Sequence, residues 1–172
     1  MKVFKSIAAM SVALLSFGAI AAGSHAGGHD ESDEIGKPGV AAKAGRTVQI
    51  DMSDAMRYSP ASVSVKQGET VRFIVRNSGR LKHEMVLGTK KDLEEHYEVM
   101  KKNPEMEHAD ANMVTVAPGQ AGEIVWQFTK AGKIEFACLQ PGHYDAGMKG
   151  AVNIASVKGA SMKAAGHGNH SD

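Results

Sequence analysis

The chain has little cysteine, few aromatic residues and no strong excess of charge of either sign. Its 172 residues include one Cys and one Trp, 5% aromatic residues, and 20 basic against 19 acidic residues. A single Cys excludes an intramolecular disulfide and any zinc or iron–sulfur site built from several thiolates. The near-neutral charge gives no basic field for nucleic acid, so we expect no nucleic-acid partner. The length fits one domain of ordinary size.

The one long apolar run lies at the N-terminus. Lys2 and Lys5 precede an uncharged segment over residues 7–22 that ends in small residues. This is the pattern of a secretory signal peptide, and the run is short for a membrane span, which needs about 20 apolar residues. An uncleaved membrane anchor is the alternative. We expect residues 1–21 to be removed and the mature protein to be exported, soluble and free of the membrane.

Both ends of the mature chain are rich in Gly, Ala and charge and lack aromatic residues, which predicts mobile tails over residues 22–46 and 158–172. Imidazole and carboxylate groups in these tails could bind a metal ion weakly, and solvated linkers are the alternative interpretation. The histidines concerned are His25, His29, His167 and His170.

The body of the chain, residues 47–157, alternates apolar and polar residues with a period of two and is punctuated by turn signals. This pattern predicts about seven or eight short strands in an antiparallel sandwich. One helix interrupts the strands. It should be capped by Thr89 with Asp92 as capping-box partner, end at Asn103, and bury the face that carries Leu93, Tyr97 and Met100.

The stretch 138–148 carries three metal-binding side chains at intervals of five residues. Cys138 supplies a thiolate, His143 an imidazole and Met148 a thioether. Two glycines within the stretch permit bends, so the loop can turn all three side chains toward one point. Cys138 follows a predicted strand, which places the site at one end of the sandwich.

His83 is the candidate for one more nitrogen, because it opens a predicted strand that the fold can bring to the same end. Two imidazoles, one thiolate and a distant thioether form the ligand set of an electron-transfer copper site. Zinc would also bind such a set but gains little from a Met ligand. The plain alternative is a sandwich core with a buried Cys and unrelated His residues.

The region from about Thr47 to Val157 resembles the cupredoxins, the plastocyanin- and azurin-like type 1 copper proteins. The resemblance implies a cupredoxin-like Greek-key β-sandwich with one inserted helix. It also implies that His83, Cys138, His143 and Met148 bind a single type 1 copper ion. The chain is most similar to periplasmic copper-tolerance cupredoxins of bacteria. The resemblance is carried by Tyr58, Pro60, Val63, Val65, Gly68, Val71, Asn77, Pro118, Gly119, Trp126, Phe128, Gly132, Phe136, Gly150, Val152 and Ile154 together with the Cys-x4-His-x4-Met element.

One position departs from the pattern of the electron carriers of this family. Many of them have Asn directly after the first His ligand, where it braces the cysteine loop, and this chain has Glu84. An ionised carboxylate so close to the metal would favour Cu(II). The departure weakens the case for a simple electron carrier.

Methionine is abundant, with 10 in the chain. Met106, His108 and Met113 lie in one connecting segment after the helix, and thioethers with imidazole suit Cu(I). We interpret them as a possible second copper contact. The alternative is that Met fills a core poor in aromatic residues, which is our interpretation of Met85 and Met100.

Three functions follow from these features. The first is a periplasmic protein that binds and redox-cycles copper for tolerance and homeostasis, supported by the tails, the extra Met residues and Glu84. The second is a dedicated one-electron carrier between respiratory enzymes. The third, an enzyme, has little support because the chain offers one domain and no second set of paired histidines, although slow oxidation of Cu(I) by the site stays open. We expect a monomer whose protein partner is a redox enzyme or a copper-export protein.

Overall fold

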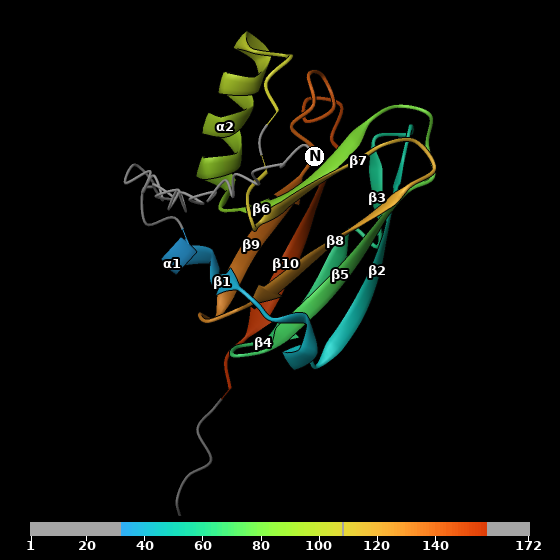
Figure 1. Cartoon of the computed structure of the whole chain (residues 1–172). Coiled ribbons are helices and arrows are strands. Elements are labelled where there is room, and N and C mark those ends of the chain that lie inside the picture. Colours follow the sequence, from blue (N-terminus) through green and yellow to red (C-terminus); the bar gives the residue numbers. More distant parts are fainter. Residues whose placement is uncertain (1–31, 108, 158–172) are drawn as a thin grey trace, which may run out of the picture.

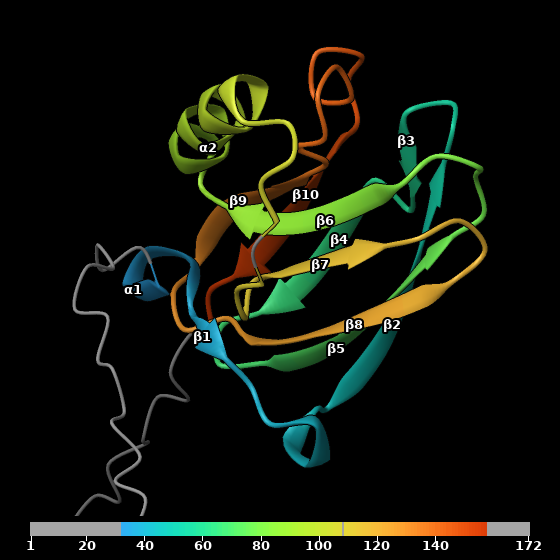
Figure 2. The same ribbon diagram turned by 45° about the horizontal axis from the view of Figure 1, so that its top comes forward.

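Ten strands form two five-stranded sheets that pack face to face. The computed structural model describes residues 32–107 and 109–157 (Figures 1 and 2). The first sheet has the order β1-β8-β5-β2-β3 and the second the order β4-β10-β9-β6-β7. The strands are β1 (Lys37–Pro38), β2 (Arg46–Ser53), β3 (Arg57–Ser59), β4 (Ser62–Lys66), β5 (Thr70–Asn77), β6 (His83–Gly88), β7 (Met113–Val116), β8 (Ala121–Gln127), β9 (Gly132–Ala137) and β10 (Lys149–Ala155).

The predicted all-β sandwich with one inserted helix is confirmed, with two differences in detail. The described residues contain ten strands in place of the expected seven or eight, because β1, β3 and β7 are too short to show a clear alternation in the sequence. Two of the pairings, β2 with β5 and β4 with β10, are parallel rather than antiparallel. Parallel neighbours arise because the chain crosses to the other sheet between β3 and β4 and then returns beside β2.

The inserted helix α2 (Lys90–Lys102) begins and ends as the sequence predicts. Thr89 accepts a hydrogen bond from the backbone N–H of Asp92, whose carboxylate accepts one from the backbone N–H of Thr89. The predicted apolar face, Leu93, Tyr97 and Met100, is buried. Both views place α2 beside the loop that joins β9 to β10 (Figures 1 and 2).

Strand β6 is buried on both of its faces, which is unusual for a strand in a sandwich of this kind. Met85 and Leu87 point into the core between the sheets, whereas Val86 packs with the buried face of α2. The helix therefore supplies a second, smaller apolar cluster outside the sheet. The first two residues of β6, His83 and Glu84, are buried polar side chains.

The segment before β2 differs from the predicted mobile tail over residues 22–46. Residues 32–46 include a short helix α1 (Ser32–Ile35), strand β1 and a 3-10 turn, Ala41–Lys43. Ile35 is buried, and its carbonyl accepts a hydrogen bond of 2.9 Å from Trp126 Nε1. Gly36 has φ +114°, and a Cβ there would lie 2.2 Å from the carbonyl oxygen of Gln127. These contacts use one apolar side chain and the backbone, so they leave no periodic pattern in the sequence.

The remaining predictions for the chain ends lie outside the described residues. They concern the signal peptide over residues 1–21, the segment 22–31 and the tail 158–172. Within the described part of the chain, no helix is both long enough and apolar enough to span a bilayer.

Candidate metal centre

The loop between β9 and β10 holds three of the four predicted ligands. Cys138 follows β9 directly and Met148 directly precedes β10. The backbone N–H of Cys138 donates to the carbonyl of Met148 over 3.1 Å, and that of Met148 donates to the carbonyl of His143 over 3.0 Å. Gly142 and Gly147 have φ of +85° and +88°, a region that side chains disfavour. The two bends expected from the sequence therefore close the loop on itself.

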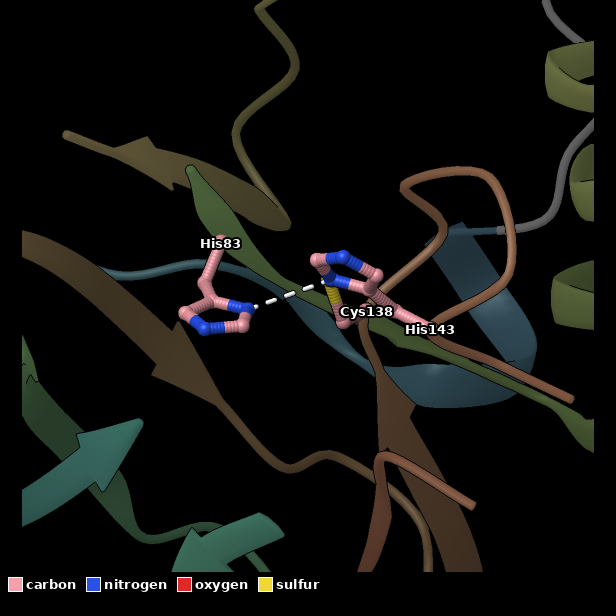
Figure 3. Close-up of side chains that lie close together, drawn as sticks. All are labelled: His83, Cys138 and His143. Atoms are coloured by element: carbon pink, nitrogen blue, oxygen red, sulfur yellow. Dashed lines mark hydrogen bonds between the residues drawn. The ribbon is translucent and has the colours of Figure 1, made fainter. Parts of the chain in front are cut away.

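The structure brings His83, Cys138 and His143 together at one end of the sandwich (Figure 3). Nδ1 of His83 lies 3.2 Å from Nδ1 of His143, which in turn lies 3.3 Å from Sγ of Cys138. One ligand atom from each residue falls within 4.8 Å of the other two. Ligands about 2.0 to 2.3 Å from a shared ion are about 3 to 4 Å from one another, so the spacing fits a common metal.

Burial divides these three residues. His83 and Cys138 are fully buried, whereas His143 is partly exposed. Met148 is also fully buried and belongs to the same apolar cluster as Cys138. The backbone of Met148 is hydrogen-bonded to Cys138 and to His143. Its role as a distant fourth ligand stays a prediction.

The donor set suits copper. A thiolate and two imidazoles satisfy the preferences of both Cu(I) and Cu(II). Nδ1 of each His faces the cluster. Nε2 of His83 points away from the cluster and can hydrogen-bond to another group that orients the ring. The residues present therefore fit one copper ion at this point.

Asp54 holds the His83 ring from that side, a role that the sequence analysis missed. Nε2 of His83 lies 3.1 Å from Oδ1 of Asp54, whose carboxylate also accepts the backbone N–H groups of Arg80 and Leu81. Those bonds, that of Arg80 most, lower the pKa of Asp54. The only signal in the sequence is Gly79, where a Cβ would lie 2.0 Å from Oδ1 of Asp54.

We expect Asp54→Ala to weaken Cu(II) binding about 10- to 100-fold, because outer carboxylates that orient a metal-binding His have effects of this size. Asp54→Asn is the matched control. It retains an oxygen acceptor for His83 and should lose much less. Competition against a copper chelator measures both variants, and an unchanged affinity in Asp54→Ala would remove Asp54 from the site.

Glu84 braces the cysteine loop, the role that Asn has in many electron carriers. It is buried, and Oε1 accepts the backbone N–H of Leu139 over 2.9 Å. Oε2 accepts the side-chain amide of Gln140 over 2.9 Å. The backbone carbonyl of Glu84 accepts the hydroxyl of Tyr58 over 2.6 Å. The Glu at this position thus preserves the brace and adds a carboxylate beside Cys138.

The surroundings hold the Cys138 thiol in its protonated form. Burial is the largest cause that raises the pKa of Cys138 to about 12, and the charge of Glu84 contributes in the same direction. Backbone hydrogen bonds partly offset these effects. Burial, followed by the charge of His83, lowers the pKa of His143 below its ordinary value of 6.5.

These shifts predict how copper affinity changes with pH. Since the thiol pKa lies far above neutrality, binding a metal to the thiolate releases one proton, so affinity should rise about tenfold per pH unit from pH 7 to pH 9. His143 adds nothing in this range because its lowered pKa leaves it neutral. Chelator competition at several pH values gives the slope. A slope of zero would contradict thiolate binding, and Cys138→Ser should abolish the slope.

The secondary copper contacts predicted from the sequence are only partly described. Met106 and Met113 line one pocket, together with Met100. His108, His25, His29, His167 and His170 lie outside the described residues.

Comparisons with known proteins agree with this geometry. The model of the copper-binding proteins of the plastocyanin/azurin family matches residues 44–155. The copper-resistant cuproprotein CopI of Rubrivivax gelatinosus is 56% identical over 137 residues, which are 80% of this chain and 82% of that protein. The CopI of Pseudomonas aeruginosa is 36% identical over 167 residues, covering 80% of this chain and 90% of that protein.

Solved structures of auracyanins share the fold. Reduced auracyanin from Roseiflexus castenholzii superposes with a TM-score of 0.56 at 23% identity, over 65% of this chain and 98% of its own. Auracyanin B gives a TM-score of 0.57 at 22% identity, over 70% of this chain and 96% of its own.

Proposed function

Because the chain belongs to the plastocyanin/azurin family of copper-binding proteins, we propose that it is an exported protein that binds and redox-cycles copper to protect the cell against excess copper. The observation that carries the proposal is the convergence of His83, Cys138 and His143 on one point. Relatives named copper-resistant cuproproteins support the tolerance role. The signal-peptide pattern of residues 1–21 supports export to the periplasm.

In this proposal His83, Cys138 and His143 would hold a single type 1 copper ion, and Met148 would be a weak fourth ligand. The metal supplies a reversible one-electron couple. The buried residues exclude water and hold a ligand set intermediate between the preferences of Cu(I) and Cu(II), so that little rearrangement accompanies a change of charge. The chain acts as a monomer, by binding rather than by enzymatic turnover.

A dedicated electron carrier is the second candidate. The observation in its favour is that His143 is partly exposed and follows the exposed residues Pro141 and Gly142, so a partner could approach one ligand directly. Small, transient contacts of this kind are typical of redox pairs. Glu84 does not exclude this role, since it maintains the brace of the cysteine loop.

Deleting the gene separates the two candidates. For a tolerance protein, the deletion strain should stop growing at lower copper concentrations than the parent while respiring normally without added copper. A respiratory defect with normal copper tolerance would instead establish the electron carrier. Complementation with the intact gene is the control in both cases.

The histidines near the two ends of the chain give a further prediction. Replacing His25, His29, His167 and His170 by Ala should reduce the number of weakly bound copper ions and lower tolerance, while leaving the visible copper band unchanged. We expect these histidines to bind copper more weakly than the preformed centre does. Equilibrium dialysis measures the stoichiometry. An unchanged stoichiometry and unchanged tolerance would mean that these residues serve only as linker.

A further inference from the structure

A pocket lies next to the candidate metal centre, between the C-terminal end of α2 and the starts of β6 and β7. It has a volume of about 130 Å³, and three methionines from different elements line it. Met100 comes from α2, Met106 from the segment after α2, and Met113 from the first position of β7. The sequence grouped only the last two of these, because Met100 fitted the apolar face of the helix.

Core packing accounts for two of the three side chains but not for the third. Met100 and Met113 are buried in the apolar cluster under α2. Met106 is 43% exposed although it is a large apolar residue. Two buried methionines and one exposed methionine therefore line the same pocket.

The charges around the pocket suit a small cation. Glu84, Glu107 and Lys82 line it, which gives two negative charges against one positive. Nζ of Lys82 lies 3.3 Å from Oε1 of Glu107, so these two charges are paired. The carboxylate of Glu84 is left as the unbalanced charge. Thioethers are soft ligands that select Cu(I), which is a monocation, over hard divalent ions.

The pocket also touches the first centre. Gln140 lines it, and this residue belongs to the loop that carries Cys138 and His143. The side-chain amide of Gln140 donates to Glu84, whose other oxygen holds the backbone N–H of Leu139. One carboxylate is thus shared between the pocket and the brace of the copper loop.

We propose that Met100, Met106 and Met113 form a second copper site, specific for Cu(I), beside the type 1 centre. The site extends the proposed function by holding a cuprous ion next to the redox-active metal. Its ligands are distinct from those of the first centre, so the two assignments can fail separately.

Methyl NMR of the full mature protein, with ¹³C-labelled methionine methyl groups, tests this site. Cu(I) is added without oxygen, and Ag(I) is used as a redox-inert substitute. The methyl signals of Met100, Met106 and Met113 should shift together. Those of Met52 and Met85, which are buried in the same apolar cluster as Cys138 and Met148, serve as internal controls and should change only when the first centre fills. If the methyl signals of Met100, Met106 and Met113 do not shift, the proposal is overturned.

A triple variant with Met100, Met106 and Met113 replaced by Leu gives an independent measurement. It should bind one Cu(I) fewer than the intact protein in competition with a chromogenic Cu(I) chelator, and Met52→Leu with Met85→Leu is the matched control. Leu preserves the volume of Met, so folding should be retained. A visible band on adding Cu(II) that matches that of the intact protein would show that the variant is folded and that its first centre is unchanged. Equal Cu(I) stoichiometry in both variants would contradict the second site.

Discussion

Cys138→Ser is expected to abolish the strong visible absorption that we predict for the Cu(II)-loaded protein. That band arises from charge transfer between a cysteine thiolate and copper, and the chain contains one Cys. A hydroxyl is not a soft donor and cannot produce the same transition. Ser is close to Cys in size, and its hydroxyl can hydrogen-bond Nδ1 of His143, which lies 3.3 Å from Sγ of Cys138, so the substitution should leave the fold intact.

Absorption spectroscopy during a Cu(II) titration gives the result directly. Circular dichroism of the variant without copper provides the control for folding. Met52→Leu, a change at a fully buried position of the main core, should retain the band. A coloured Cys138→Ser protein would overturn the assignment of the thiolate as ligand.

Glu84→Ala is expected to lower the free energy of unfolding by about 3 kcal/mol, since hydrogen bonds to charged groups contribute about 1.5 to 3 kcal/mol each. The substitution leaves the buried backbone N–H of Leu139 without its acceptor and releases the amide of Gln140. The loop that carries Cys138 and His143 should then be less well positioned, so copper affinity should fall as well. Urea denaturation of the copper-free protein measures the stability.

Glu84→Gln separates the brace from the charge. Its side chain retains an oxygen for Leu139 and should lose much less stability than Ala. It removes a negative charge near the thiolate, so it should raise the reduction potential by disfavouring Cu(II). Voltammetry measures this shift. A potential that stays constant or falls would show that the carboxylate acts through hydrogen bonds alone, and full stability of Glu84→Ala would contradict the brace.

The close approach of Cys138 and His143 could be predicted from the sequence because the information is local. Cys138, His143 and Met148 lie within one stretch whose glycines mark the bends, and the structure places the first two side chains together. Placing His83 near these residues required only that its strand begin at the end of the sandwich where the loop after Cys138 lies. The alternation of β6 predicted the inward face of Met85 and Leu87, but not the burial of the other face, which α2 covers.

Contacts made over long sequence separations could not be predicted in the same way. Asp54 reaches His83 from a turn 29 residues away, and the only trace is the missing side chain of Gly79. Ile35 is held through its own carbonyl and through the backbone pairing of Lys37 and Pro38 with β8, and these contacts leave no periodic pattern in the sequence. Met100 has two roles on one helix face, and periodicity identifies only the first.

The most direct test of whether this centre protects the cell is the copper tolerance of a strain whose chromosomal gene carries Cys138→Ser. The measurement is the copper concentration that stops growth, compared with the parent and the deletion strain at equal protein level by immunoblot. We expect the Cys138→Ser strain to be as sensitive to copper as the deletion strain. Tolerance equal to that of the parent would contradict it, because protection would then not require the only thiolate in the chain.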